Sequence, residues 1–496
     1  MSLYSTNFSQ MDWRIVVVYL AVTALVGIWA NRYVGNLSDY LVAGRTLRIR
    51  LAVATMTGTE LGLVTMMYMA ELGYSQQYAS LYLAVLEGTA LLAVGLTGVL
   101  VMRLRDTSVM TIPEFYERRY SRGVRILGAI VLVISGVLNM GLFLKAGSQF
   151  LTAIVGWESG DHALELKWVM TGLLLLVLFY TVLGGMVSVV ITDLIQFLVL
   201  GVGMLIITGL VLMNVGWDGM LDVSREHAGY VNPFEAVNPS GMGSPIGWLT
   251  VVEMAIIIFS AATLWPPSAA RTLSVKSGEV ARQLYLYSSI SLLSRRAIPI
   301  LWGIGAFAFL AARPEMKADF DAAVAADQIN QWSAMPLFLA KIVPSGLLGF
   351  VTAGMIAAFM STHDSYLLCW SGVVAQDIAG PVFGPLSQRQ GILITRVSIL
   401  VIGAILLFWG LWYELSASLW NYMAITGTIY LAGARPVVAG GLYWPRGSTS
   451  GAYAALAGGA FAVCALGPIL KVLTGVFPGL RSGHVTLLTF AVSALL

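Results

Sequence analysis

The sequence predicts an all-α integral membrane protein with about 13 transmembrane helices, organised as a single polytopic domain over residues 1–496. Three observations predict this class. First, 58% of the residues are hydrophobic and 11% are charged, whereas soluble domains carry about 25% charged residues. Second, apolar runs recur about every 30 residues, and most are long enough to cross a bilayer. Third, helix-breaking residues interrupt two of these runs, which lie five spans apart.

The same composition excludes several classes of protein. A chain with so few charges is not a soluble enzyme, and its net charge of +3 is too small to indicate a nucleic-acid partner. Cys369 and Cys464 both lie in apolar runs, so they indicate neither a disulfide framework nor a metal site. The partners that we expect are the lipid bilayer, a coupling ion and a small solute, with no obligate protein partner evident.

The spans follow one another with short connections. A leading helix at 13–32 follows the polar segment Met1 to Asp12, which lacks the basic start of a signal peptide, so we expect the helix to be retained. The further predicted spans are 50–74, 78–103, 122–153, 167–184, 188–214, 247–267, 284–313, 345–377, 390–413, 416–443, 450–475 and 482–496. Two longer loops, 215–246 and 314–344, are predicted to form short surface helices.

Positive charge predicts the orientation. With the N-terminus outside, the loops assigned to the cytoplasm hold roughly three times as many Lys and Arg residues as the outer loops. We therefore expect a multi-pass protein of the plasma or inner membrane, with its N-terminus outside and its C-terminus in the cytoplasm.

Two interrupted helices suggest a repeat. The run from Leu51 to Gly62 is broken by small and polar residues, and the run from Gly247 ends in Trp265-Pro-Pro267. Prolines remove backbone donors and break helices. Paired broken helices are typical of inverted-repeat transporters, whose sites lie near the bilayer midplane. Plain kinking, which is common in membrane helices, is the alternative.

The segment from Ala357 to Tyr366 carries the most chemistry. Ala358, Ser361, Thr362 and Ser365 have the spacing of one helix face, and Asp364 borders it. Hydroxyl, carbonyl and carboxylate oxygens suit a small hard cation such as Na⁺. The hydroxyls could instead bond to carbonyls one turn back, but that alternative does not explain a carboxylate inside a span.

Other polar residues within spans are candidates for a site or for structural ion pairs. The acids include Glu60, Glu87 and Asp193, and the Arg295-Arg296 pair could be their partner. Three aromatic residues of one late span, Trp420, Tyr422 and Tyr430, could line a cavity or simply pack. No P-loop and no catalytic constellation occurs in the sequence. We therefore expect a non-enzyme without a cofactor, driven by an ion gradient.

Several motifs resemble one family, the sodium:solute symporters. They are Ser38-Asp-Tyr-Leu-Val-Ala-Gly-Arg45, Thr111-Ile-Pro-Glu-Phe-Tyr-Glu-Arg-Arg-Tyr120, Tyr180-Thr-Val-Leu-Gly-Gly185, Thr192-Asp-Leu-Ile-Gln196, Ser361-Thr362 and Gly440-Gly-Leu-Tyr-Trp-Pro-Arg446 with Gly451-Ala452. The family includes symporters for proline, pantothenate, sialic acid and sugars. The resemblance implies a LeuT-type five-plus-five inverted repeat, with a first repeat at 50–214, a second at 247–443 and trailing helices at 450–496.

The resemblance also implies a Na⁺ site. Its ligands would be the backbone oxygens of Ala54 and Thr57 in the broken helix, together with Ala358, Ser361 and Thr362.

A second cation or proton site would use Asp193, Asp364 and Ser365. Asp364 stands where the family often has Ser. Ala270-Arg271 stands where many members have Gln-Arg.

For the solute, we expect contacts from Glu60, Glu87, Trp265 and Tyr422. Glu87 lies close to a substrate-contacting position of the sugar-transporting members, whereas Trp265-Pro-Pro267 is unusual for the family. The predicted function is Na⁺-coupled uptake of a small polar organic solute: an amino acid, a carboxylate, a sugar or a vitamin. The alternatives are a proton-coupled carrier of the same fold that uses His363 and Asp364, a transporter-like membrane sensor, and an intramembrane enzyme.

Overall fold

A computed structural model describes residues 2–30, 46–157, 162–226, 248–413 and 419–496. These residues form helices joined by short connections, and within them no β-strand occurs apart from an isolated bridge between Leu47 and Val275. The motif at 38–45 and most of the loop at 215–246 lie outside the described residues.

The first half of the chain contains the following helices: α1 (Gln10–Ala30), α3 (Ile49–Glu60), α4 (Leu63–Gln76), η3 (Gln77–Ser80), α5 (Leu81–Thr97), α6 (Val101–Asp106), α7 (Ile112–Arg119), α8 (Arg122–Met140), α9 (Phe143–Val155), α10 (His162–Asn214) and α11 (Trp217–Glu226). Hydroxyl side chains cap several of them. Thr111 accepts a hydrogen bond from the backbone N–H of Glu114 at the start of α7, and Ser121 accepts one from Val124 at the start of α8.

The second half contains α12 (Trp248–Leu264), α13 (Pro266–Ser274), α14 (Gly278–Ala311), α15 (Pro314–Ala325), η4 (Gln331–Ser333), α16 (Ala334–Ile342), α17 (Leu347–Val373), the π-helical η5 (Val374–Ala379), α18 (Gly380–Phe383), α19 (Gln388–Trp412), α20 (Leu419–Tyr443), α21 (Thr449–Gly459), η6 (Ala460–Ala465), α22 (Gly467–Val476) and α23 (Ser482–Leu495). The short helices predicted within 314–344 are present as α15 and α16. Helix α15 lies at the surface as predicted, whereas α16 is buried except at Lys341.

Both interrupted helices are confirmed. Helix α3 ends at Glu60 and α4 begins at Leu63, so the break lies at Leu61 and Gly62. The second break lies at Trp265, where α12 and α13 differ in direction by 41°. Pro266 and Pro267 follow it directly and cannot donate to the preceding turn.

The predicted spans are only partly matched. Length and apolar composition identify five helices able to cross a membrane in the described part of the chain, or up to seven if each bent pair is one span. The total of 13 therefore stays a prediction. The predicted spans 167–184 and 188–214 both lie in α10, which stays helical from His162 to Asn214. Its 53 residues are far more than the roughly 20 that one crossing needs, so the division into two spans stays a prediction. Gly184 and Gly185 do not end α10, since a helix in an apolar surrounding keeps its backbone hydrogen bonds internal.

The span predicted at 450–475 is also interrupted. Helix α22 leaves the direction of the preceding helix at Leu466 by 84°. Pro468 lies in the first turn of α22, where its missing N–H costs no hydrogen bond.

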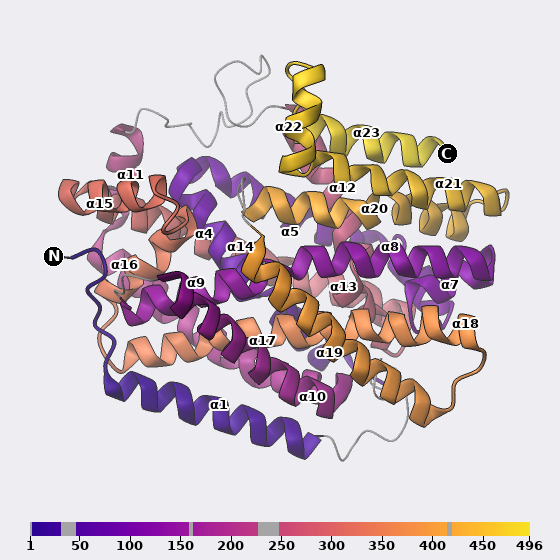
Figure 1. Cartoon of the computed structure of the whole chain (residues 1–496), viewed down its shortest axis with the longest axis horizontal. Helices are drawn as coiled ribbons and strands as arrows, with labels where there is room; N and C mark the ends of the chain where they lie inside the picture. Colours follow the sequence, from indigo (N-terminus) through magenta and orange to yellow (C-terminus); the bar gives the residue numbers. More distant parts are fainter. Residues whose placement is uncertain (1, 31–45, 158–161, 227–247, 414–418) are drawn as a thin grey trace.

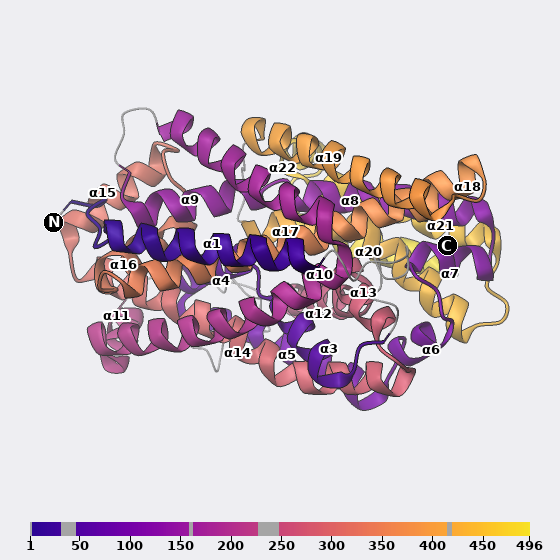
Figure 2. The ribbon, with the colours of Figure 1, turned by 90° about the horizontal axis from the view of Figure 1, so that it is seen from below.

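The long helices run along the longest axis of the molecule (Figure 1). Helix α1 lies on one side of the bundle against α10 and α17, as Figure 2 also shows. The trailing helices α21 and α23 cover α20 on the opposite side. Helices α6 and α7, each with two arginines, lie at one end of the long axis, and α11, α15 and α16 lie at the other end (Figure 2). The orientation in a membrane stays a prediction.

Helices α4 and α14 cross at small residues. A methyl group on Gly73 would overlap the carbonyl of Ile300, and one on Gly303 would overlap the carbonyl of Ala70. Glycine at both positions lets the two backbones touch, as is common between membrane helices. This contact holds the half-helix after the first break against α14, which carries Arg295 and Arg296.

Asp12 of α1 caps another helix. Its carboxylate accepts hydrogen bonds from the backbone N–H groups of Gly346 (2.7 Å) and Gly349 (2.5 Å) at the start of α17, and from the Ser345 hydroxyl. The side chain is fully buried. A carboxylate at a helix N-terminus satisfies orphan donors and favours the helix dipole.

We expect Asp12→Ala to destabilise the protein by about 1–2 kcal/mol, because the first N–H groups of α17 lose their acceptor. The measurement is the midpoint of thermal unfolding in detergent, with Asp319→Ala on the exposed face of α15 as the matched control. Equal midpoints for the two variants would contradict the capping role.

Candidate functional site

Helices α3 and α17 touch at the first break. The Ser361 hydroxyl lies 3.1 Å from the carbonyl oxygen of Gly58. Gly62, in the break, packs directly on Thr362, and a methyl group there would overlap the Thr362 hydroxyl. The two adjacent hydroxyls of α17 therefore face the unwound end of α3, which is the arrangement that an ion site between these helices requires.

The other predicted Na⁺ ligands lie around this contact. Ala54 and Thr57 are buried on α3, and Ala358 is fully buried on α17, where its carbonyl accepts the Thr362 hydroxyl at 3.0 Å. The carbonyl of Thr57 accepts a hydrogen bond from Nη1 of Arg295 at 2.6 Å. A carbonyl has two lone pairs, so the Thr57 oxygen keeps one for a cation.

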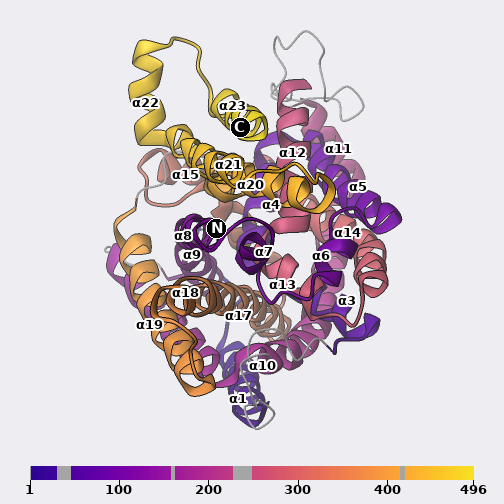
Figure 3. The same cartoon turned by 90° about the vertical axis from the view of Figure 1, so that its right-hand side faces the viewer.

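The predicted second cation site is built around Asp193 of α10. Its carboxylate accepts hydrogen bonds from the hydroxyls of Thr55 (2.6 Å), Thr59 (3.2 Å) and Ser361 (2.9 Å). Asp193 has no exposed surface. Four helices meet at this cluster, since α3, α10, α13 and α17 pack against one another (Figure 3).

The guanidinium of Arg271 lies inside this cluster. Its Nη2 donates to the hydroxyls of Thr59 (2.5 Å) and Ser365 (2.7 Å) and forms an ion pair with Asp193 at 3.2 Å. Arg271 is 1% exposed. A built-in cation therefore contacts the oxygens that were expected to hold a second ion, and the sequence pattern did not reveal it.

Asp364 and His363 lie beside the cluster on α17. Asp364 is fully buried and accepts a hydrogen bond from the Ser365 hydroxyl at 3.2 Å. Nδ1 of His363 lies 2.8 Å from the carbonyl oxygen of Phe359, and its ring packs against Phe143 and Phe359. The histidine therefore faces aromatic rings rather than the carboxylates.

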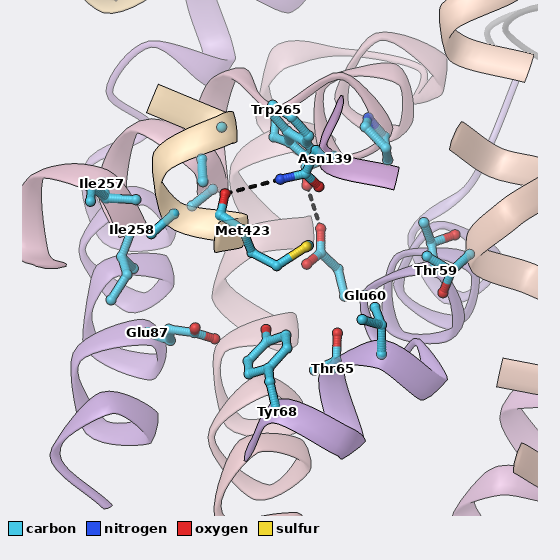
Figure 4. A pocket seen from close by; sticks show the side chains of 18 of the residues that line it. Thr59, Glu60, Thr65, Tyr68, Glu87, Asn139, Ile257, Ile258, Trp265 and Met423 are labelled. Atoms are coloured by element: carbon cyan, nitrogen blue, oxygen red, sulfur yellow. Dashed lines mark hydrogen bonds between the residues drawn. The ribbon is translucent and has the colours of Figure 1, made fainter. Parts of the chain in front are cut away.

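A cavity of about 140 Å³ lies beside the first break (Figure 4). Its walls come from α3, α4, α5, α8, α9, α12, α13, α14, α17 and α20. It contains Thr362 as well as Glu60, Glu87 and Trp265, three of the four residues expected to contact the solute. The ion contact and the cavity thus share a wall.

The acidic residues of the cavity have different partners. Glu87 of α5 forms an ion pair with Arg296 of α14, and Arg296 also donates to the Tyr68 hydroxyl at 2.7 Å. Glu60 accepts a hydrogen bond from the hydroxyl of Ser268, on the far side of the second break. Glu60 and Ser268 therefore join the two broken helices at the cavity.

The three aromatic residues predicted to line a cavity have different surroundings in the structure. Trp420 lines the cavity, whereas Tyr422 points away from it and donates to the carbonyl of Leu138 at 2.5 Å. Tyr430 shares a hydrogen bond with Tyr116. The structure therefore does not bring Tyr422 to the predicted solute site.

Sequence reasoning missed several cavity residues, among them Tyr68, Asn139 and Ser268. Asn139 was detectable in principle, because an amide in the apolar run of α8 needs partners. It donates to the Met423 carbonyl and to the Thr426 hydroxyl, both at 2.9 Å. Tyr68 and Ser268 gave no signal of that kind.

Comparison with known proteins agrees with this architecture. The model of the sodium:solute symporter family matches residues 40–459. The chain is 24% identical to a sodium/proline symporter of Staphylococcus aureus over 469 residues, covering 90% of this chain and 84% of that protein. It is 26% identical to a sodium/glucose cotransporter of Vibrio parahaemolyticus over 406 residues, covering 78% of this chain and 72% of that protein.

A solved structure has the same fold. The substrate-bound, outward-open structure of a Na⁺-coupled sialic acid symporter superposes with a TM-score of 0.79 at 17% identity, covering 98% of this chain and 97% of that one. Members of the matched family are Na⁺-coupled multi-pass membrane transporters rather than enzymes, and Na⁺ is their coupling ion. The match over most of the chain shows that this protein belongs to the sodium:solute symporter family.

Proposed function

We propose that the protein couples the entry of Na⁺ to the uptake of a small polar organic solute, which binds in the cavity between the two broken helices. The observation that carries the proposal is the position of Thr362. Its side chain lines the cavity and packs on Gly62 at the break of the first helix. A Na⁺ ion at the α3–α17 contact and a solute in the cavity would therefore meet the same side chain.

The proposed Na⁺ site uses the carbonyl oxygens of Ala54, Thr57 and Ala358 with the hydroxyls of Ser361 and Thr362. These are hard oxygen ligands without a thiol or imidazole, as a hard cation prefers. Coupling would be mutual, since an ion that raises the affinity for the solute must itself be bound more tightly when the solute is present.

We further propose a single Na⁺ per transport cycle. The second position, formed by Asp193, Ser365 and the neighbouring Asp364, is held by the guanidinium of Arg271. The arginine supplies one fixed positive charge there, so a second Na⁺ would have to displace it. A one-ion cycle differs from the two-site scheme that the family resemblance implies.

The transport cycle that we propose follows the predicted five-plus-five repeat. The repeats at 50–214 and 247–443 would rock against each other around the cavity and expose it to either side in turn. The protein would lie in the plasma or inner membrane with its N-terminus outside, so that uptake is inward. The names of the relatives include proline, glucose and sialic acid, and we expect a solute within this range of sizes.

The direct test is Na⁺-dependent stabilisation of the purified protein. We expect NaCl, but not KCl at the same ionic strength, to raise the midpoint of thermal unfolding, because a ligand bound only to the folded state stabilises it by mass action. Reconstituted vesicles with an inward Na⁺ gradient should then accumulate a solute identified by such a screen. Equal midpoints in the two salts, together with uptake driven by a proton gradient alone, would reject the proposal in favour of a proton-coupled carrier.

A further inference from the structure

We propose that the solute carries a positively charged nitrogen, either as a free amine or ammonium or as the amino end of a zwitterion. This inference rests on the proposed function, because it assigns the chemistry of the cavity in which the solute would bind. It follows from the balance of charge, hydrogen-bond acceptors and aromatic rings around that cavity.

Among the residues that the structure describes, only one of the two cavity carboxylates forms an ion pair. The carboxylate of Glu87 contacts Arg296, and both side chains are less than 10% exposed. Glu60 has the neutral hydroxyl of Ser268 as its hydrogen-bond partner. Figure 4 shows the Glu60 carboxylate pointing into the space between Met423 and Trp265. Arg295 and Arg296 act on Glu60 electrostatically without forming an ion pair with it among the described residues, and a cationic solute would supply that direct partner.

Arg295 does not take this role. It is next to Arg296 in the chain, but it does not line the cavity. Its Nη1 donates to the Thr57 carbonyl at 2.6 Å and its Nε donates to the Ser291 carbonyl at 3.0 Å. Its charge acts on Glu60 from a distance, but its hydrogen bonds are made to backbone oxygens and not to the Glu60 carboxylate.

The helix ends around Glu60 favour a cation as well. Glu60 is the last residue of α3, and the C-terminal end of a helix carries a partial negative charge. The facing N-terminus of α13 begins with Pro266 and Pro267. An ordinary helix N-terminus binds anions through its free N–H groups, but these two residues have none. The second break is therefore a poor site for a carboxylate or phosphate group.

A second acceptor points to the same chemistry. The amide nitrogen of Asn139 donates to Met423 and Thr426, which fixes the orientation of the side chain. Its Oδ1 is buried and has no protein hydrogen-bond partner among the described residues. Asn139 lines the cavity together with Glu60. An N–H donor on the solute would satisfy this oxygen, and a methylated ammonium would leave it to a water molecule.

The remaining walls are mostly apolar, and five of their residues are aromatic. The lining includes Tyr68, Phe143, Trp265, Tyr366 and Trp420. The rings of Tyr68 and Trp420 lie 5.2 Å apart, and those of Phe143 and Tyr366 lie 5.4 Å apart. Aromatic faces attract cations, and quaternary ammonium groups in particular are bound by clusters of rings.

The cavity fits a small molecule. Its volume of about 140 Å³ compares with about 10–15 Å³ for one water on the same measure, which leaves room for roughly ten non-hydrogen atoms. A zwitterion would have a place for its carboxylate at the start of α4, because Val64 and Thr65 in the first turn of that helix line the cavity.

The test uses pairs of probes that differ only by nitrogen in place of carbon. The pairs are choline with 3,3-dimethylbutan-1-ol, ethanolamine with propan-1-ol, and glycine betaine with 3,3-dimethylbutanoate, and D-glucose serves as a neutral polyol. Each is added at about 10 mM to the full-length protein in nanodiscs, in Na⁺ and in K⁺, and the midpoint of thermal unfolding is measured. The choline and ethanolamine pairs probe a free cation, and the betaine pair probes a zwitterion.

We expect at least one charged-nitrogen probe to raise the midpoint in Na⁺, and its carbon counterpart to have no effect. In Glu60→Gln the apparent affinity for that probe should fall at least tenfold, while the shift caused by Na⁺ alone remains. Glu71→Gln is the matched control, because Glu71 is a buried acid of α4 that does not line the cavity. This variant should keep the probe response.

Three results would overturn the inference: a Na⁺-dependent shift with glucose or a carbon counterpart equal to that of the charged probes, a charged-probe shift that survives in Glu60→Gln, or no shift with any charged probe in a protein that responds to Na⁺. A protein that does not respond to Na⁺ at all would contradict the proposed function instead. The two failures are therefore distinguishable.

Discussion

Replacing Arg271 with Gln should lower thermal stability in Na⁺-free buffer and at the same time make the protein more responsive to Na⁺. The guanidinium is 1% exposed and contacts Asp193, Thr59 and Ser365. Removing one partner of a buried ion pair leaves an uncompensated charge and costs about 3–5 kcal/mol. The oxygens left behind would be suited to a hard cation, so Na⁺ should bind in place of the arginine.

The measurement is the unfolding midpoint as a function of Na⁺ concentration. The wild type should follow a single-site curve, whereas Arg271→Gln should show a second, weaker phase of stabilisation that KCl does not reproduce. Arg389→Gln, an exposed position at the start of α19, is the matched control and should behave as the wild type. A destabilised Arg271→Gln without any additional Na⁺ response would show that Arg271 is only a structural partner of Asp193.

Asp193→Asn and Arg271→Gln together form a double-mutant cycle. The Asp193→Asn variant removes the carboxylate and leaves Arg271 buried without its counter-charge, so it should also be strongly destabilised, but without rescue by Na⁺. The double variant Asp193→Asn with Arg271→Gln should be more stable than the sum of the single losses predicts, because neither buried charge remains unpaired. Additive losses would mean that the two side chains do not interact energetically.

The broken helices were predictable because their signals are local. Two prolines after Trp265 and the small residues before Gly62 disrupt helical hydrogen bonding wherever the chain lies. The face formed by Ser361, Thr362 and Ser365 was predictable for the same reason, since the helical period alone places them together. The family motifs then assigned these local features to a known architecture.

The contacts between distant helices were not predictable in this way. Arg271 and Asp193 are 78 residues apart, and nothing in the spacing of either residue names the other. The sequence also did not show how α20 is rotated about its own axis. Trp420 and Tyr422 differ by about 200° around a helix, so only the packing of α20 against α8 decides which ring faces the cavity. Composition also could not show that α10 continues through Gly184 and Gly185.

Thr362→Ala should raise the Na⁺ concentration needed for half-maximal stabilisation or uptake by roughly tenfold or more. The Thr362 hydroxyl is one of two side-chain ligands in the proposed ion site, and a hydrogen bond or ligand contact to a charged group contributes about 1.5–3 kcal/mol, where each 1.4 kcal/mol is about tenfold. Thr362→Ser keeps the hydroxyl and should stay close to the wild type.

Thr352→Ala provides the matched control. Thr352 lies on the same helix, is fully buried, and donates to the carbonyl four residues earlier at 2.7 Å, as Thr362 does at 3.0 Å. The two alanine variants therefore lose the same local hydrogen bond, and only one of them loses the contact with the break at Gly62. Equal Na⁺ dependence in both would place the ion elsewhere. A loss confined to Thr362→Ala, accompanied by an equal loss in the factor by which Na⁺ raises solute affinity, would show that this one side chain links ion binding to the solute cavity.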